Sequence, residues 1–329
     1  MVIIKDKVYG EVDLTEPVLI ELMASSPLVR LKGIDQNGVP GFVLKGGNTS
    51  RFEHCVGVMI LLRLLGASVE EQIAGLLHDV PHTAFSHAID WVFGQQEEQE
   101  FHEKFFEKLV LDSEIPSILL KHGFDVKKVI DPHKFSLLEK DAPDLCGDRV
   151  DYTFRDSLSW FGDEGKDVLG VIDSLENFEG EIVFNDAEAA LVFARRYLVL
   201  DCEFWAGPWY MSGFYYLALA VKRGLEIGVI LEEDLFLEDK EVYSKLKESG
   251  DGEILSALEM LPKCKDAKVV SEKTDIVYKS KVRFIDPKVL VDGELVRVSM
   301  LFPSFLLELE EHKKRFVLDR YLLVEGKGY

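Results

Sequence analysis

Apolar residues recur at every third or fourth position through most of this chain, and this spacing predicts a mainly α-helical fold. The pattern runs from about residue 16 to residue 261, and it is clearest in five stretches, 56–65, 69–77, 101–111, 187–200 and 209–230. A chain of 329 residues can bury a sizeable core. We therefore expect a bundle of helices to form the main body of the protein.

Two shorter regions flank this helical body. Residues 1–16 mix β-branched residues with a glycine turn, which predicts an N-terminal β-hairpin. After Pro262 the residues alternate as they do in strands, and Asp292-Gly293 is typical of a hairpin turn. A helix at about 303–314 and a last strand follow. We expect a hairpin at 1–16, a helical domain at 17–262 and a small α+β lobe at 263–329.

The charge of the chain argues against a long nucleic acid as its partner. Lys and Arg number 38 and Asp and Glu number 59, which gives a formal net charge of −21. Such a surface repels phosphate polymers, and counterion release cannot help it to bind them. A small anion remains possible as a ligand, because a local group of arginines and a metal ion can overcome a distant negative field.

No membrane segment or secretory leader is expected. Residues 204–221 carry no charged side chain over 18 positions, the lower limit of a membrane span, but Gly207-Pro208 should interrupt a helix there. We therefore expect a buried core helix. The four cysteines are too scattered for a disulfide framework or a cysteine zinc site, which favours reduced, packed cysteines and a cytoplasmic location: Cys55, Cys146, Cys202 and Cys264.

Histidine and aspartate are concentrated in the first half of the helical body. Five of the eight histidines lie between residues 54 and 102, and the stretch 78–90 reads H-D-V-P-H-T-A-F-S-H-A-I-D. Ser68 and Glu71 form a capping box that starts the helix leading to His78, and Pro81 should end it. A helix that ends at His78-Asp79 allows both side chains to reach one ion.

A second polar stretch, G-D-R-V-D-Y-T-F-R-D, spans residues 147–156. We predict a helix here that begins with Asp141 as its N-cap and Pro143 in its first turn. Residues four positions apart share one face of such a helix and could line a pocket wall: Asp148, Tyr152 and Asp156. Arg149 lies beside Asp148.

These residues supply the ligands and the proton carriers of a metal-dependent hydrolase. Two imidazoles and two carboxylates suit a single divalent transition metal, Fe, Mn, Zn, Ni or Co, and we predict that its ligands are His54, His78, Asp79 and Asp148. A bound ion of this kind lowers the pKa of water and polarises a phosphoryl oxygen. The groups left for proton transfer are His82, His87, Asp90 and His102.

Other polar residues have simpler interpretations. Three histidines lie outside these patterns and are expected to be ordinary surface or core residues, namely His122, His133 and His312. Asp151 and Arg155 are expected to form an ion pair between successive helical turns. The acidic run at 232–241 is expected to be a solvated face.

The motifs resemble those of the deoxynucleoside triphosphate triphosphohydrolase branch of the HD superfamily, which includes bacterial dGTPase-like enzymes and the mammalian SAM-and-HD-domain dNTPase. The similarity rests on R-F-E-H at 51–54, the histidine run at 78–90 and D-R-V-D-Y at 148–152, and it extends from about residue 8 to 160. It implies hydrolysis of a dNTP to deoxynucleoside and inorganic triphosphate, the activity of a triphosphoric monoester hydrolase. It also implies a homo-oligomer and possible additional Mg²⁺ with the nucleotide.

The resemblance also implies roles for individual residues. Arg51 and Arg149 would contact the substrate phosphates. Gln36, Tyr152 and Asp156 would contact the sugar, and the histidine and aspartate groups already named would surround the metal and the α-phosphate.

Two departures from the family pattern leave alternatives open. Pro81 replaces the usual glycine of the H-D-x-G-H motif, and the region 201–221 has no clear arginine for the β- and γ-phosphates. A phosphomonoesterase or phosphodiesterase that acts on a smaller or cyclic nucleotide is the first alternative. A binding module that senses a nucleotide without turnover is the second, although acid-base groups beside the ligands favour an enzyme.

Overall fold

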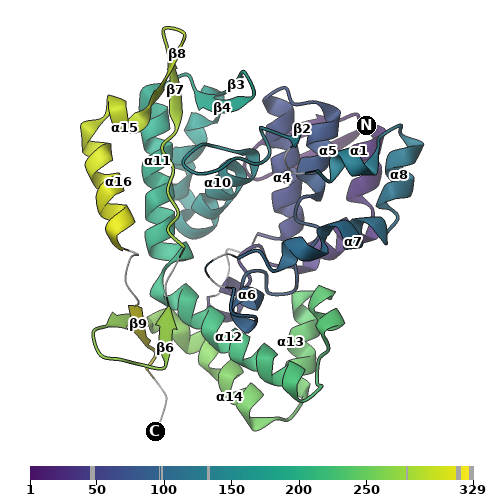
Figure 1. Ribbon diagram of the computed structural model, residues 1–329, viewed down its shortest axis with the longest axis vertical. Helices are drawn as coiled ribbons and strands as arrows, with labels where there is room; N and C mark the ends of the chain where they lie inside the picture. Colours follow the sequence, from purple (N-terminus) through teal and green to yellow (C-terminus); the bar gives the residue numbers. More distant parts are fainter. Residues whose placement is uncertain are drawn as a thin grey trace.

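The computed structural model describes residues 1–44, 49–95, 97, 99–131, 134–278, 281–315 and 320–325. The mainly helical fold is confirmed, together with the N-terminal hairpin and small sheets built largely from C-terminal residues (Figure 1). His133, which the sequence places among the ordinary histidines, lies outside the described residues.

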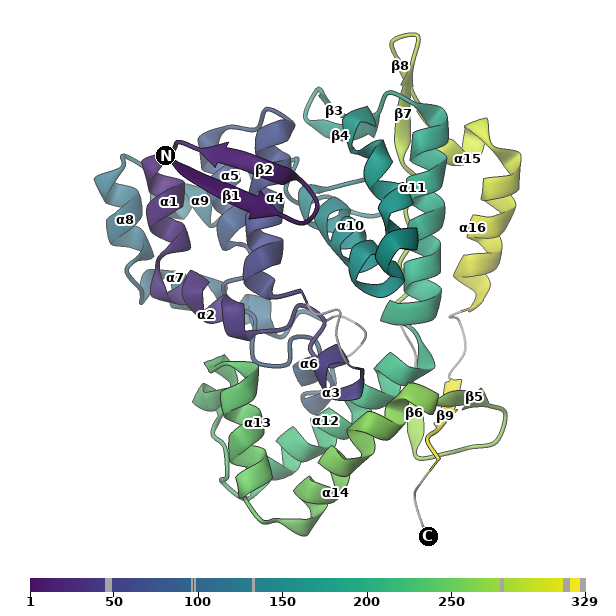
Figure 2. The same ribbon diagram turned by 180° about the vertical axis from the view of Figure 1, so that it is seen from behind.

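The N-terminal hairpin covers one side of the first helical group. Its strands β1 (Val2–Asp6) and β2 (Gly10–Leu14) are antiparallel, and they lie across α4 (Arg51–Leu64) in the view of Figure 2. Its turn is fastened to two helices, because Lys7 pairs with Glu53 on α4 and Asp6 pairs with Arg155 on α10 (Gly147–Phe161). The hairpin therefore connects the helix that carries His54 with the helix that carries Asp148.

The first helical group packs around α4 and α5 (Val69–Leu77), which lie against each other. Most of their apolar side chains are buried, because both helices are enclosed by shorter ones, whereas Leu64 at the end of α4 is exposed. The surrounding helices are α1 (Pro17–Met23), α2 (Ser26–Arg30), α7 (Phe106–Leu111), α8 (Ile115–Lys121) and α9 (Val126–Val129).

The second helical group forms around α12 (Pro208–Glu226). Helix α11 (Ala187–Leu200) runs into a π-helical turn at Asp201–Trp205, and Pro208 then starts α12, so the predicted interruption at Gly207-Pro208 is confirmed. Among the described residues no helix has the length and apolarity needed to cross a bilayer. The helices packed on α12 include α3 (Pro40–Val43), α6 (Ala88–Val92), α13 (Asp239–Glu248) and α14 (Gly252–Met260).

Residues after 262 form strands that return to the helical body. A four-stranded sheet has the order β3 (Leu175–Phe178), β4 (Glu181–Phe184), β7 (Lys288–Val291) and β8 (Glu294–Arg297). A second sheet has the order β5 (Lys268–Val270), β9 (Arg320–Leu323) and β6 (Ile276–Tyr278). The predicted hairpin turn at Asp292-Gly293 is confirmed, since both residues have positive φ. Helices α15 (Val298–Leu301) and α16 (Pro303–Arg315) complete this part.

Candidate metal centre and active site

Helix α4 presents His54 from its first turns. Ser50 caps the helix by accepting a hydrogen bond from the Glu53 backbone N–H, and the Glu53 carboxylate accepts one from the Ser50 backbone N–H. This capping box fixes where the helix begins, and so it fixes which side of it His54 occupies. The His54 side chain is 1% exposed, at the junction of α4, α5 and α10.

His78 stands at the C-terminal end of α5, as the sequence predicts, with Ser68 as the N-cap of that helix. Its Nδ1 lies 2.7 Å from the carbonyl oxygen of Gly75. A carbonyl oxygen only accepts, so Nδ1 carries the proton and Nε2 offers a lone pair. Nε2 is buried and has no hydrogen-bond partner among the described residues. A buried lone pair without a donor is the kind of atom that a metal ion satisfies.

Asp148 lies in the first turn of α10, but that helix does not begin where the sequence suggested. The prediction of Asp141 as N-cap and Pro143 in the first turn is wrong, because α10 begins at Gly147 with Cys146 as its N-cap. The preceding residues are held extended: Leu145 bridges to Ile182, and the N–H of Gly147 donates to the Leu137 carbonyl oxygen. These partners, distant in sequence, delay the helix until Asp148 reaches His54.

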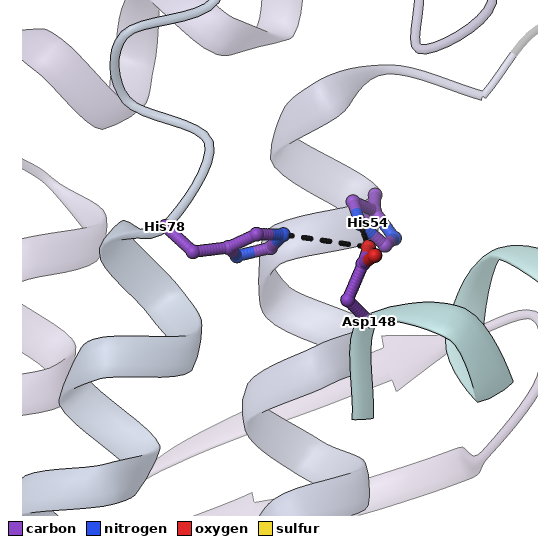
Figure 3. Close-up of side chains that lie close together, drawn as sticks. All are labelled: His54, His78 and Asp148. Carbon is purple, nitrogen blue, oxygen red and sulfur yellow. Dashed lines mark hydrogen bonds and ion pairs between the residues drawn. The ribbon is translucent and has the colours of Figure 1, made fainter. Parts of the chain in front are cut away.

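The four predicted ligands converge at this junction, and Figure 3 shows three of them. Nitrogen and oxygen atoms of His54, His78 and Asp148 lie within 4.8 Å of one another. His54 Nε2 is 2.9 Å from Asp148 Oδ1, and His78 Nε2 is 3.6 Å from the same oxygen. Asp79 adjoins them, with Oδ1 at 3.6 Å from His78 Nε2 and Oδ2 at 3.8 Å from His54 Nε2.

The cluster could hold a divalent transition metal, since it combines imidazole nitrogens with carboxylate oxygens. Burial alone would lower the pKa of His54, but hydrogen bonds to Asp148 and Asp151 raise it to about 10. Burial would raise the pKa of Asp148, whereas the hydrogen bond from His54 and the nearby imidazole of His78 hold it well below its usual value. The carboxylates thus favour a positive charge at this point.

Asp151 is a supporting residue whose second role the sequence did not reveal. Its predicted ion pair with Arg155 is confirmed at 2.7 Å, but the same Oδ2 atom also lies 2.7 Å from His54 Nδ1. Arg155 in turn reaches Asp6 of the hairpin turn at 2.8 Å. A carboxylate behind a ligating histidine fixes its tautomer and its orientation. The available signal was the i,i+3 spacing of Asp148 and Asp151.

Gly57 makes room for this chain of contacts. It follows His54 on the same helix, and a Cβ atom at position 57 would collide with the side chains of Arg155 and Asp151. The two helices can therefore approach closely enough for Asp151 to reach His54 only because residue 57 has no side chain.

The predicted proton-transfer residues form a second group beside the first. His87 Nδ1 lies 3.0 Å from Asp90 Oδ2, and the rings of His82 and His102 stack with their centroids 3.6 Å apart. His82 Nε2 is 3.3 Å from Asp79 Oδ1, which joins this group to the metal cluster. Burial and the charge of Arg51 lower the pKa of His82 well below its usual value. Burial lowers that of His102 to about 3, so both rings are neutral at physiological pH.

The predicted phosphate contacts are engaged with the protein itself. Arg51 donates to Asp79 Oδ2 at 2.7 Å and also binds Ser86 and the Gln36 carbonyl. Arg149 is directed to the preceding loop, where it donates to the carbonyl oxygens of Lys140 and Asp144 and to Cys146. Arg51 therefore contacts Asp79, one of the four predicted metal ligands, whereas Arg149 is held at the preceding loop.

The predicted sugar contacts lie among aromatic rings. Asp156 accepts hydrogen bonds from Asn37 Nδ2 at 2.9 Å and from Trp205 Nε1 at 2.7 Å. Tyr152 shares a hydroxyl hydrogen bond with Tyr197 and packs edge-on against Trp205. Gln36 is buried, and its side-chain oxygen lacks a partner within the described part of the chain.

The acidic run at 232–241 is not entirely a solvated face. Asp239 is 8% exposed, and its two oxygens accept the backbone N–H groups of Asp35 and Phe85. Its carboxylate thereby braces the turn at Phe85 and Ser86, both of which have positive φ. These backbone donors explain why an acidic residue lies inside the protein.

Comparisons with known proteins show what the chain is similar to. Residues 51–156 match the HD domain. The uncharacterized protein YdhJ of Bacillus subtilis is 40% identical over 90% of this chain and 91% of its own. The metal-dependent phosphohydrolase cns2 of Cordyceps militaris is 32% identical over 97% of this chain and 93% of its own. The similarity to the deoxynucleoside triphosphate triphosphohydrolase SAMHD1 of Danio rerio is partial, at 30% identity over 37% of this chain and 23% of that protein.

A solved structure supports the fold. The crystal structure of a phosphohydrolase from Bacteroides thetaiotaomicron superposes with a TM-score of 0.72 over 99% of this chain and 100% of its own. Its sequence is 16% identical, so this likeness concerns the fold alone.

Proposed function

The chain belongs to the HD-domain metal-dependent phosphohydrolases, and from this premise we propose that it hydrolyses a nucleotide phosphate ester at the cluster of His54, His78, Asp79 and Asp148. The observation that carries the proposal is the buried, unpartnered Nε2 of His78 aimed at two carboxylates and at a second imidazole. A divalent ion held there supplies an acidified water and a polarised phosphoryl oxygen when it is bound.

The chain's own residues would prepare the phosphorus and move the protons. Since Asp90 only accepts, His87 donates to it from Nδ1, so the Nε2 atom of His87 is left to take or give a proton. The ring of His102 is neutral and can donate a hydrogen bond to a developing oxyanion without carrying a fixed charge, whereas the single N–H of neutral His82 is directed at Asp79. Arg51, fixed by Asp79 and Ser86, would place a positive charge beside the same phosphate.

A deoxynucleoside triphosphate is the first proposed substrate. The support comes from the motif resemblance, from the partial similarity to SAMHD1 and from the wall of Tyr152, Asp156 and Trp205 on which a sugar could rest. One observation favours a smaller nucleotide: Arg149 is occupied by the carbonyl oxygens of its own loop. A phosphomonoesterase or phosphodiesterase is therefore the second candidate.

Product analysis on a nucleotide panel separates the two candidates. Protein loaded in turn with Mn²⁺, Fe²⁺, Co²⁺, Ni²⁺ or Zn²⁺ should release intact triphosphate from a dNTP if the first is right. Release of orthophosphate alone, or opening of a cyclic phosphate, would support the second. The double variant His78→Ala with Asp79→Ala should lose both metal and activity, whereas His122→Ala, which removes only a contact to Glu21, should keep both. Turnover that persists in the double variant would refute the site.

A further inference from the structure

A cysteine, a histidine and an aspartate stand in line at the end of α11, away from the metal cluster. His312 Nδ1 lies 3.4 Å from Cys202 Sγ, and His312 Nε2 lies 2.9 Å from Asp201 Oδ2. Arg315 adds a guanidinium N–H that donates to the same sulfur at 3.2 Å. The cysteine and aspartate belong to the π-helical turn after α11, and the other two residues to α16, which lies alongside α11 in Figure 1.

The contacts of His312 decide where its protons lie. Its Nε2 faces two acceptors, the Asp201 carboxylate and the Arg283 carbonyl oxygen, each at 2.9 Å, so this nitrogen carries a hydrogen. Burial would lower the pKa of His312, but Asp201 and Cys202 raise it to about 9. An imidazolium then holds its second hydrogen on Nδ1, pointed at the sulfur. This arrangement favours a thiolate at Cys202, paired with His312 and Arg315.

The other three cysteines differ from Cys202 in their burial and in the pKa of their thiols. Cys55, Cys146 and Cys264 are buried, and burial raises the pKa of each thiol, to about 12 for Cys146 and about 11 for Cys264. Cys202 is partly exposed. Burial would raise its pKa as well, but the hydrogen bond and charge of His312 and of Arg315 lower it below the usual value. One sulfur is thus both accessible and activated, and the sequence-based expectation of four packing cysteines misses this.

We propose that Cys202 is a modification site, a thiolate that reacts with small hydroperoxides. The sulfur attacks the terminal oxygen of the peroxide, the O–O bond breaks, and an S–O bond forms. The sulfur is oxidised by two electrons to a sulfenic acid while the peroxide is reduced to an alcohol or water. The leaving oxygen takes the Nδ1 proton of His312, so that thiolate, imidazolium and hydroperoxide become sulfenic acid, neutral imidazole and alcohol.

A chain of hydrogen bonds runs from Asp201 through Arg283 to Gln99. The Asp201 carboxylate is fully buried and binds both His312 and the backbone N–H of Arg283, whose guanidinium donates to Gln99. Gln99 lies three residues before His102 in the sequence.

Alkylation of the folded protein with iodoacetamide, followed by mass spectrometry of each cysteine peptide, tests the thiolate. At pH 7 an ordinary thiol is only a few per cent ionised, so Cys202 should react up to about 10-fold faster than a cysteine in the denatured chain. Arg315→Gln should lower that rate several-fold, and His312→Asn should lower it further. Lys313→Ala, which removes a pair with Glu310 and a cation–π contact with Phe284 but leaves the contacts of Cys202, is the matched control. A Cys202 rate no higher than that of the denatured chain would overturn the proposal.

Treatment with hydrogen peroxide or an alkyl hydroperoxide, with dimedone present to trap a sulfenic acid, tests the reaction itself. A dimedone adduct should form at Cys202 and be absent from Cys202→Ser. Because Arg315 is exposed, Arg315→Gln should fold normally, and it keeps the test decisive if His312→Asn does not fold. An adduct that forms equally fast in wild type and Arg315→Gln would contradict activation by this cluster.

Discussion

His54 and His82 are both buried histidines in contact with Asp79, yet their surroundings move their pKa values in opposite directions. His54 lies between Asp148 and Asp151, and these two carboxylates outweigh the effect of burial. His82 has one carboxylate contact and faces Arg51 and the ring of His102, so burial prevails. The number of carboxylates around each ring thus distinguishes a place for a cation from a set of neutral proton carriers.

The comparison divides the site into two parts with separable effects. Residues of the cation side, on α4, α5 and α10, should control whether a metal is bound. Residues of the neutral side, between residues 82 and 102, should control the rate once it is bound. Each substitution below therefore has one predicted effect on metal content and another on turnover.

The largest effect is expected from Asp148→Ala. It removes the carboxylate that touches both His54 and His78, and it leaves two imidazoles without their shared anion. Metal content, measured by elemental analysis after dialysis, should fall to the level of His78→Ala with Asp79→Ala, and activity should fall to background. Full metal content in this variant would show that Asp148 is not a ligand.

His87→Ala should impair proton transfer without affecting metal binding. General acid-base groups contribute roughly 10²–10⁴-fold to a rate, so kcat should fall by an amount in that range while metal content stays at the wild-type level. Asp90→Asn should give a smaller loss, because the amide can still accept a hydrogen bond from His87 Nδ1 through its oxygen. Loss of metal from His87→Ala would contradict the division between the two sides.

The sequence predicted the positions of His54 and His78 because local signals determine where α4 begins and where α5 ends. Ser68 caps the start of α5, and Pro81 follows the end of that helix, where His78 lies. The capping box at Ser50 sets the start of α4. The predicted start of α10 was wrong because contacts with Leu137 and Ile182 hold the preceding loop extended. No local rule encodes partners so far apart in the sequence.

Residues that act from behind the site were harder to predict. Asp151 already had a sufficient interpretation in its pair with Arg155, so its i,i+3 spacing from Asp148 was not read as a sign of contact with His54. Asp239 is buried because its oxygens accept hydrogen bonds from the backbone N–H groups of residues 35 and 85. Every residue except proline has such a group, so the sequence does not indicate which ones Asp239 will meet. The arrangement of Arg149 depends likewise on carbonyl oxygens.

Asp151→Asn sharpens the comparison on the cation side. An amide keeps the shape of the residue and can still accept a hydrogen bond from His54 Nδ1, but it removes the negative charge that raises the basicity of the ring. Removal of such a supporting carboxylate typically costs about 10–100-fold in metal affinity. Competition with a metal-binding dye measures this directly, and Asp6→Asn, one step farther along the chain of contacts, should have a smaller effect. Equal affinities in wild type and Asp151→Asn would mean that the contact does not support the ligand.

The smallest effect tests how closely the helices behind His54 must approach. Gly57→Ala places a methyl group against Arg155 and Asp151, whereas Gly170→Ala points a methyl group into open space. Overpacking of a tight contact costs about 1–3 kcal/mol, so chemical denaturation should show a loss of that size for Gly57→Ala and almost none for Gly170→Ala. Because the strain falls on the partner of His54, Gly57→Ala should also weaken metal binding, by less than Asp151→Asn does. Destabilisation with unchanged metal affinity would show that α4 and α10 can separate without moving His54.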